Sequence, residues 1–510
     1  MAGNNSPVIC VVIARTRHKM MQAEIEQAAK QGAKMIELRL DFLAKPPDYK
    51  RLLANKHCPL IATVRRPADG GRFAGTEEER LMLLRQAVVA GFDWVDLETD
   101  IIDRVPRFGK VKRIVSYHNL REVPTNLDEI YKHMCEQDAD VVKLSVTAQH
   151  PTDNLRVFSY FKDAPKPTIA HCMGDMGICS RVLAGKFGSP FTYGALNKER
   201  TVAPGILSFA ELKKIYHFEE TNPATEVYGV IGDPVGHSLS PLLHNMAFRH
   251  HGINAVYIPF RVPRGDLATF LKKFEQLPVR GYSVTLPHKE EAAHLAAWKD
   301  EAVELTGAAN TLIRSPAGWR AYNTDAQASI DSLEANMLPI ADGTQIPISS
   351  LTVLILGAGG VARAIAYMLQ KRGANLLIAN RTGERAQKLA QEVGCRIVDW
   401  QARHSVLCDV VINCTSVGMH PNVDESPVHS SFLTLGLTVF DTVYTPETTL
   451  LIREAHERGC NFLTGVDMFV RQAALQFKLF TGLDAPLDAS FELVRKVLSP
   501  VNLGQDDTRI

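Results

Sequence analysis

Eight apolar runs recur through roughly the first two hundred residues of this 510-residue chain, and a helix-like segment separates most of them. The runs begin at Val8, Met35, Leu60, Trp94, Arg113, Val141, Thr168 and Phe191. Eight successive strand–helix units favour a closed (β/α)8 TIM barrel within an α/β protein. The fourth crossover, residues 100–112, is the weak point of this prediction, because it is barely long enough to hold a helix.

Polar side chains share one face of four of these expected strands. Successive side chains of a strand point to opposite faces, so residues two apart lie on the same side. The pairs on the polar face are Glu37 with Arg39, Thr63 with Arg65, Ser116 with His118, and Lys143 with Ser145. They gather near the C-terminal ends of the strands, where barrels of this kind carry their active sites. A ring of charged groups in that position is hard to explain as packing.

Lys143 stands in the middle of the buried-looking run DADVVKLSV. An unpaired buried ammonium is costly, so the ordinary alternative is an edge strand whose lysine reaches solvent. Inside an apolar barrel, desolvation favours the neutral amine, which attacks carbonyls to form a Schiff base. His118 is a suitable general acid–base, with a hydrogen-bonded core histidine as the alternative. Together with Arg39, Arg65 and Arg181 as carboxylate ligands, these residues predict a Schiff-base lyase or aldolase for a small anionic keto compound.

A polar stretch at residues 217–227, HFEETNPATEV, marks the expected domain boundary. Strand–helix alternation then resumes with VYGVIG, AVYIPF and GYSVTLP. From Leu351, the sequence LTVLILGAGGVARAIAYMLQKRGANLLIANRT predicts a strand, a Gly-rich turn, a helix and a second strand. This is the dinucleotide-binding fingerprint in its required context, with Ala362 at the third glycine position. The expected cofactor-binding residues are Gly357, Ala358, Gly359, Gly360, Val361, Ala362, Asn380, Arg381, Thr382, Thr415 and Gly465.

The residues after the second strand of this fingerprint indicate which nicotinamide cofactor is used. An NAD site has an acidic residue there to bind the ribose hydroxyls, whereas this chain has Asn380, Arg381 and Thr382. A guanidinium in this position suits the 2′-phosphate of NADP(H), which is the predicted cofactor. An ordinary surface arginine is the alternative explanation.

Composition excludes several classes of partner. Lys and Arg number 57 and Asp and Glu 56, so neither nucleic acid nor a membrane surface is an expected partner. The nine cysteines include no CxxC pair and no His/Cys cluster at zinc spacing, which predicts reduced thiols and no metal site. The N-terminal residues have neither a basic segment nor a long apolar run, so we expect a cytoplasmic protein.

Longer motifs add a resemblance to known families. IELRLDF, TVRRPADGG, VSYHN, VVKLSV and MGDMGICSRVLAGKFGSPFTYGAL resemble type I 3-dehydroquinate dehydratase over residues 6–217. The resemblance implies that Lys143 forms the Schiff base with 3-dehydroquinate and that His118 moves the proton. It also implies substrate binding by Glu37, Arg39, Arg65, Asp69 and Arg181. Two departures, Asp69 for the usual Glu and Ile206 for a usual Gln, imply weaker substrate binding.

Residues 226–500 resemble shikimate dehydrogenase through GDPVGHSLSPLLHN, GYSVTLPHKE, GAANTL and YNTDAQ. By this resemblance, Lys289 and Asp325 handle the proton at the reacting oxygen while hydride passes between substrate and nicotinamide. The implied substrate-binding residues are Ser238, Ser240, Thr285, Asn310 and Gln472. Taken singly, such residues are ordinary, since the serines could cap a helix and NTD is a common turn sequence.

The combined prediction is a bifunctional enzyme that dehydrates 3-dehydroquinate and then reduces 3-dehydroshikimate to shikimate with NADPH. Its expected domains are a barrel over residues 1–221, a substrate-binding domain over 225–335, a Rossmann domain over 345–470, and C-terminal helices over 471–510 that pack back on the substrate-binding domain. One alternative is an NAD-dependent quinate/shikimate dehydrogenase, which Arg381 disfavours. Another is an inactive regulator of the quinate pathway, which the presence of Lys143, His118, Lys289 and Asp325 disfavours.

Overall fold

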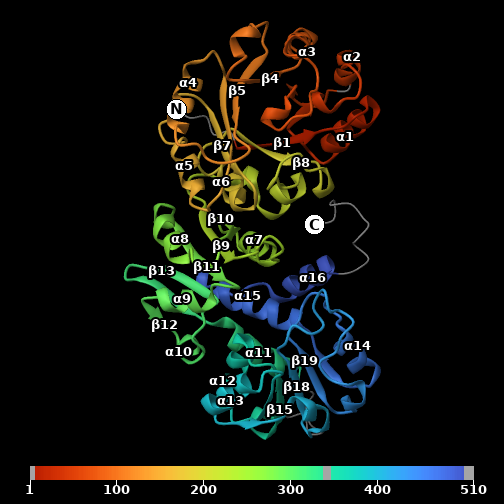
Figure 1. Ribbon diagram of the computed structural model, residues 1–510, viewed down its shortest axis with the longest axis vertical. Helices are drawn as coiled ribbons and strands as arrows, with labels where there is room; N and C mark the ends of the chain where they lie inside the picture. The colour runs from red at the N-terminus through yellow and green to blue at the C-terminus, as the bar shows by residue number, and fades with distance from the viewer. Residues whose placement is uncertain (1–5, 55, 337–345, 499–510) are drawn as a thin grey trace. The chain divides into compact units, whose positions relative to one another are not determined.

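The computed structural model describes residues 6–54, 56–336 and 346–498 of the chain (Figure 1). These residues form two compact units, one ending at Val279 and the other beginning at Arg280. This division differs from the domain boundary expected near residues 221–225, which stays a prediction. The expected domain ends at residues 1, 345 and 510 lie outside the described residues.

The first unit begins with an eight-stranded parallel sheet, which confirms all eight predicted runs. Its strands are β1 (Val8–Ile13), β2 (Met35–Arg39), β3 (Leu60–Thr63), β4 (Trp94–Glu98), β5 (Lys112–His118), β6 (Val141–Thr147), β7 (Thr168–Met173) and β8 (Phe191–Ala195). They are ordered β7-β6-β5-β4-β3-β2-β1-β8. No ladder joins β7 to β8 in the described part of the chain, so the barrel is nearly closed rather than closed. The outer edge of β8 instead forms a bridge from Ala195 to Ser208.

Helices connect the barrel strands on the outside of the sheet (Figure 1). They are α1 (His18–Lys30), α2 (Tyr49–Leu53), α3 (Glu77–Ala90), α4 (Leu127–Glu136), α5 (Asp153–Ser159) and α6 (Ile178–Leu183). The capping box of Thr76 and Glu79 starts α3, and Gly91 ends it in the left-handed conformation. Between β4 and β5 the described chain has only the 3-10 turn η3 (Ile102–Arg104), as the short spacing predicts.

Apolar side chains fill part of the barrel interior and confine the polar groups to one end. Cys10, Ile61, Ile114 and Ile169 come from alternate strands and belong to one buried cluster. In a barrel, inward residues of alternate strands pack in layers, so the charged positions further along each strand form a separate layer. That layer lies at the C-terminal ends of the strands. Beyond the barrel, the first unit continues with the parallel pair β9 (Glu226–Gly232) and β10 (Ala255–Arg261), and with helices α7 (Ser240–His250) and α8 (Leu267–Lys273).

The second unit opens with four short strands. β11 (Val279–Val284) pairs antiparallel with β13 (Thr311–Ser315), which pairs antiparallel with β14 (Gly318–Tyr322). β12 (Trp298–Lys299) runs parallel to β14. The helices of this part are α9 (Lys289–Leu295), α10 (Glu301–Thr306) and α11 (Thr324–Asn336).

The rest of the second unit is a doubly wound nucleotide-binding fold. Its six parallel strands are ordered β17-β16-β15-β18-β19-β20. Their bounds are β15 (Thr352–Leu356), β16 (Asn375–Ala379), β17 (Arg396–Ile397), β18 (Val410–Asn413), β19 (Thr438–Asp441) and β20 (Asn461–Leu463). The helices are α12 (Gly360–Lys371), α13 (Gly383–Val393), α14 (Leu450–Glu457), α15 (Gly465–Thr481) and α16 (Leu487–Leu498). Two apolar clusters, one on each face of the sheet, make it a three-layer structure.

No described helix has both the length and the hydropathy that crossing a lipid bilayer requires.

Candidate active sites

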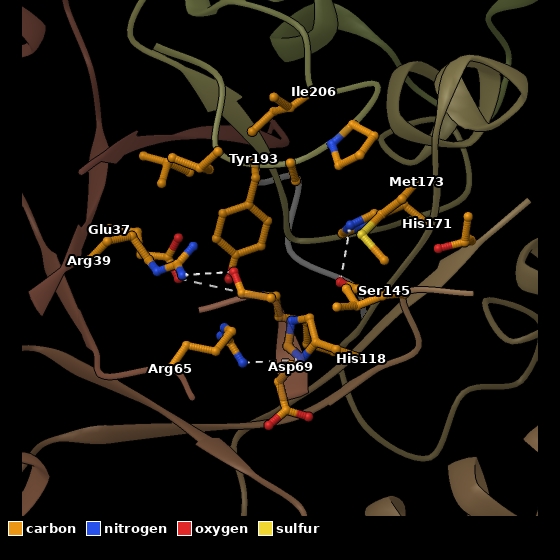
Figure 2. A pocket seen from close by; sticks show the side chains of 18 of the residues that line it. Glu37, Arg39, Arg65, Asp69, His118, Ser145, His171, Met173, Tyr193 and Ile206 are labelled. Carbon is orange, nitrogen blue, oxygen red and sulfur yellow. Dashed lines mark hydrogen bonds and ion pairs between the residues drawn. The ribbon is translucent and has the colours of Figure 1, made fainter. Parts of the chain in front are cut away.

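A cavity of about 280 Å³ opens at the C-terminal ends of the barrel strands (Figure 2). Its lining includes all seven barrel residues that the sequence nominates, namely Glu37, Arg39, Arg65, Asp69, His118, Lys143 and Arg181. Ile206, the position that departs from the resembled family, also lines it. Side chains alternate between the two faces of a strand. The nominated strand residues share the face that the barrel encloses, so their side chains point inward.

Lys143 lies at the centre of this cavity, and its surroundings are not apolar. Its Nζ is 2.9 Å from Asp96 Oδ2 and 3.8 Å from Glu37 Oε1, and it lies 4.0 Å from the centroid of the Tyr193 ring. The apolar surroundings predicted from the sequence are therefore wrong for this amine, because a buried carboxylate directly contacts it and compensates for the lost water. The 5% exposed Lys143 is therefore a paired lysine on a buried strand, rather than one reaching solvent from an edge.

Arg65 contacts the ring of His118 and fixes its tautomer. Arg65 Nη1 lies 3.1 Å from His118 Nδ1, and an arginine can only donate, so Nδ1 is the accepting nitrogen. The ring proton of the neutral imidazole is then on Nε2. Burial, followed by the positive charges of Arg65 and Lys143, lowers the pKa of His118 well below its usual value. His118 is therefore neutral near pH 7 and able to accept a proton.

The three arginines of the cavity have different partners. Arg65 forms ion pairs with Asp96 at 2.9 Å and Glu98 at 3.0 Å. Burial opposes its charge, but these carboxylates outweigh burial and raise the pKa of Arg65. Arg39 makes a two-pronged contact with Asp41, at 2.9 and 2.8 Å.

Arg181, on α6, has no carboxylate partner within the described part of the chain. Its Nε makes no hydrogen bond there, and burial lowers its pKa to about 10, which still leaves it charged at pH 7. Of the three arginines, Arg181 is thus the one ready to bind a carboxylate from outside the protein.

Two carboxylates of this site were missed by the sequence reasoning. Asp96 and Glu98 occupy alternate positions of β4, on the same face as the other interior residues, and both are nearly fully buried. Burial would raise the pKa of Asp96, but Arg65, Lys143 and His118 outweigh it and hold that pKa low. The run WVDLE showed the same alternation of apolar and charged residues as the nominated strands. Applying the same test of alternating apolar and charged residues to this fifth strand would have predicted both residues.

In the second unit, Lys289 and Asp325 form a direct pair. Lys289 is the first residue of α9 and Asp325 lies in the first turn of α11, and their Nζ and Oδ2 atoms are 2.6 Å apart. Both side chains keep some exposure, 24% for Lys289 and 13% for Asp325, so a ligand can reach them. The pairing predicted from two distant motifs is therefore present, and Thr285 lies at the end of the strand that leads into α9.

Asn310 joins this region to α15. Its side chain lies 2.9 Å from Thr324 Oγ1 and 3.5 Å from Gln472 Oε1. One turn further along α15, Gln476 accepts a hydrogen bond from Ser283 at 2.7 Å and donates to the Asn310 carbonyl at 3.0 Å. Gln476 was not nominated, although two glutamines four apart on one helix lie on the same face and give a usable signal.

Ser238 and Ser240, the remaining nominated substrate ligands, lie in the first unit. Ser240 begins α7, and its backbone N–H donates to Ser238 Oγ at 3.2 Å. Neither side chain caps α7 in the usual way. The helix-cap alternative therefore does not account for these serines, although Ser238 does stabilise the turn that leads into the helix.

The nucleotide-binding turn has the geometry that a bound dinucleotide needs. Gly357 ends β15 with φ 115°, and an added Cβ would meet the Cys414 carbonyl oxygen at 2.9 Å, so only glycine fits. Gly359 and Gly360 have no atom within 4 Å of an added Cβ, which leaves the N-terminus of α12 open to a phosphate. Gly465, at the start of α15, packs so closely on Val443 that a Cβ would lie 2.4 Å from its backbone.

The loop after β16 presents the nominated specificity residues. Asn380 donates to the Thr382 carbonyl at 2.8 Å and so shapes this loop. Arg381 is exposed and forms no ion pair with any residue that the structure describes. Thr415, after β18, donates to Asn413 Oδ1 at 2.7 Å. These residues thus fit a nucleotide at the C-terminal edge of the sheet, where such folds bind one.

Comparison with known proteins finds successive family matches along the chain. Family models match in order: type I 3-dehydroquinase over residues 9–223, shikimate dehydrogenase substrate binding domain over 230–312, shikimate/quinate 5-dehydrogenase over 341–432, and shikimate 5′-dehydrogenase C-terminal domain over 465–498. A crystal structure of a shikimate dehydrogenase in complex with NADP+ is similar to 55% of this chain, covering 97% of its own, with 32% identity and a TM-score of 0.51.

Two proteins are similar to this chain in sequence. A shikimate dehydrogenase (NADP+) of Methanothermobacter thermautotrophicus is 37% identical over 54% of this chain and 98% of its own length. The chloroplastic bifunctional 3-dehydroquinate dehydratase/shikimate dehydrogenase of Arabidopsis thaliana is 37% identical over 96% of this chain and 85% of its own length. With both halves matched in one relative and in the same order, this chain belongs to the family of bifunctional 3-dehydroquinate dehydratase/shikimate dehydrogenases.

Proposed function

We propose which residues carry out the two reactions of this bifunctional enzyme, the dehydration of 3-dehydroquinate and the reduction of 3-dehydroshikimate to shikimate. The observation that carries the first assignment is Lys143, the one lysine among the described residues that line the barrel cavity. His118 lies on the neighbouring strand, and the buried Arg181 has no carboxylate partner among the described residues. These are the groups that Schiff-base chemistry on a small keto acid requires.

In the dehydratase, Lys143 attacks the ketone of 3-dehydroquinate and forms an imine with loss of water. Asp96, 2.9 Å from Nζ, orients the amine, and neutral His118 can take up the proton that the ammonium loses on becoming a nucleophile and pass it to the departing water. Neutral His118 removes a proton from the carbon next to the imine, and the electrons flow into the protonated imine nitrogen. They return to expel the hydroxyl two carbons away from the imine carbon, which leaves as water with the proton that His118 had removed, and a second water molecule then hydrolyses the imine and frees Lys143. Arg181 binds the substrate carboxylate.

In the dehydrogenase, Lys289 and Asp325 act on the oxygen that becomes the new hydroxyl. Because Lys289 Nζ is 2.6 Å from Asp325, the carboxylate keeps the ammonium oriented so that it can donate a proton as negative charge develops on that oxygen. Asn310, Gln472 and Thr285, which lie in the same unit as this pair, bind the substrate's hydroxyls. NADPH, when bound, supplies the hydride.

For the cofactor, we propose that the turn from Gly357 to Ala362 holds the pyrophosphate and that Arg381 contacts the 2′-phosphate. The open N-terminus of α12 and the unpaired guanidinium of Arg381 support this proposal. Related dehydrogenases are named for NADP(+).

The nine cysteines form no disulfide in the structure, and we propose a reducing compartment, the cytoplasm, as the location of the protein.

The experiment that tests the first assignment is chemical trapping. Borohydride added with 3-dehydroquinate should inactivate the dehydratase and add the mass of the reduced ligand at Lys143. Lys143→Ala should abolish dehydration and leave the dehydrogenase rate unchanged, while Lys112→Ala, an exposed lysine at the opposite end of β5, should leave both rates unchanged. A Lys143→Ala enzyme that dehydrates normally would show that the barrel cavity works by other chemistry.

A further inference from the structure

Three polar side chains from consecutive strands form one wall of the dehydratase cavity. They are Ser145 on β6, His171 on β7 and Tyr193 on β8. His171 Nε2 lies 3.1 Å from Ser145 Oγ, and the His171 and Tyr193 ring centroids are 6.5 Å apart. Figure 2 shows the Tyr193 ring in the middle of the cavity, between the Glu37–Arg39 side and the side formed by Ser145 and His171.

Two polar atoms of this wall are buried without a hydrogen-bond partner in the described protein. They are His171 Nδ1 and the Tyr193 hydroxyl, and each residue is only 4% exposed. Leaving such a group unsatisfied costs about 1–3 kcal/mol, so a purely structural position would favour Phe or another apolar side chain. Because both residues line the same cavity, a bound molecule is the partner that can satisfy them.

Both groups are neutral near pH 7, which indicates what they bind. Burial, followed by the charges of Arg181 and Lys143, lowers the pKa of His171 well below its usual value. Burial, followed by Glu37 and Asp96, raises the pKa of Tyr193 well above its usual value. A neutral imidazole and a neutral phenol can each donate and accept, so they complement hydroxyl groups better than they complement carboxylates. The carboxylate of the substrate already has Arg181.

The distance to the reacting amine places these groups beside the substrate ring. Lys143 Nζ is 4.0 Å from the centroid of the Tyr193 ring, so a six-membered ring joined to Nζ contacts Tyr193. We propose that His171 and Tyr193 are direct substrate-binding residues of the dehydratase that hydrogen-bond to the ring hydroxyls of 3-dehydroquinate, with Ser145 orienting the imidazole. This proposal rests on the assignment of the Lys143 cavity as the dehydratase site.

Tyr193→Phe separates this role from a structural one. Removing a hydroxyl that bonds substrate should raise KM for 3-dehydroquinate about 2–10-fold with kcat nearly unchanged, as the loss of one neutral hydrogen bond predicts. The same change should keep or raise Tm, because it removes an unsatisfied buried group. Tyr131→Phe is the matched control, since its hydroxyl bonds Thr168 outside the cavity and its loss should leave KM unchanged.

For His171, two amide variants distinguish the two ring nitrogens. Asn places its polar group near the position of Nδ1, whereas Gln places one near Nε2, the nitrogen that faces Ser145. His171→Leu should raise KM, His171→Asn should recover much of the loss, and His171→Gln should recover little. Recovery by Gln alone would make Ser145, rather than substrate, the partner that matters and would overturn the proposal for His171.

Trapping with borohydride separates the failure of this proposal from failure of the underlying site. If wild-type protein is not labelled at Lys143, the site assignment itself is wrong. If wild-type and Tyr193→Phe proteins are both labelled and their KM values agree, the wall does not bind substrate and the proposal is overturned. Should His171→Leu fail to fold, the near-isosteric Tyr193→Phe variant and its control decide the outcome.

Discussion

At the scale of single residues, two motifs that lie far apart in the sequence are in close contact. Lys289 and Asp325 are 36 residues apart, yet their charged atoms are 2.6 Å apart. The pair is only partly buried and so adds little to stability, and in our proposal it orients a proton donor. Its strength as a catalytic device should therefore appear in turnover.

Lys289→Ala should lower kcat of the dehydrogenase roughly 100-fold or more and change KM much less, because proton donation is needed chiefly in the transition state. Steady-state kinetics with 3-dehydroshikimate and NADPH measures both constants. Lys371→Ala, an exposed lysine paired with Glu301, is the control and should behave as wild type. A change confined to KM would make Lys289 a binding residue.

Arg381 decides between the two nicotinamide cofactors in our proposal. A guanidinium on a 2′-phosphate gains a charge-assisted contact of about 1.5–3 kcal/mol and nothing comparable from NADH. Arg381→Ala should therefore lower kcat/KM with NADPH by roughly one to two decades and leave the NADH value almost unchanged. The exposed Arg396 on β17 provides the matched alanine control. An unaltered ratio of the two cofactor efficiencies would mean that another basic residue binds the phosphate.

At the scale of secondary-structure elements, Asp441 links β19 to its neighbours. It accepts hydrogen bonds from Asn413 on β18 at 3.0 Å, from the Val443 backbone at 3.0 Å, and from Thr449, the N-cap of α14, at 2.7 Å. Burial nevertheless raises the pKa of Asp441 to about 6. The folded protein therefore retains this proton at pH values where the unfolded chain has lost it.

Because the pKa of Asp441 is higher in the folded state, its contribution to stability falls as pH rises from about 3.8 to about 6, and stays low above that. Asp441→Asn keeps the two bonds accepted by Oδ1, reverses the third so that Nδ2 donates to the Thr449 hydroxyl, and removes this titration. The stability of the variant relative to wild type should thus increase by roughly 1 kcal/mol between pH 5 and pH 8. Thermal unfolding at the two pH values measures it, with exposed Asp424→Asn as control. A pH-independent difference would contradict the shift.

At the scale of the whole molecule, the first unit includes more than the barrel. Arg261 of β10 lies 3.4 Å from Asp175 of the barrel, and His150 lies 3.2 Å from Asp266 before α8. Partly exposed ion pairs of this kind contribute about 0–1 kcal/mol each, so the barrel does not depend on them. This is why a cut near residues 221–225 should be tolerated, although the boundary between the two compact units falls later in the chain.

Separate expression of residues 1–221 and 225–510 should give a dehydratase and a dehydrogenase, each with nearly the full-length rate. A second pair of fragments, 1–279 and 280–510, is the control for the first pair. This pair should keep dehydration and lose reduction, because its cut falls inside β11 and divides the expected substrate-binding domain, residues 225–335. Rates on 3-dehydroquinate and 3-dehydroshikimate provide the measurement. If residues 225–510 are inert and the full chain is active, the two halves need each other.

The order and type of the elements could be predicted from the sequence, because a strand alternates its faces every two residues and a Gly-rich turn between strand and helix has few other uses. The nominated barrel residues reach one cavity for the same reason. The tertiary structure alone decided their partners. Asp96 reaches Lys143 across 47 residues, and Arg65 is used to orient His118. Such pairings depend on which strands become neighbours and on how far each side chain extends. The periodicity of apolar residues along one strand gives no information about either.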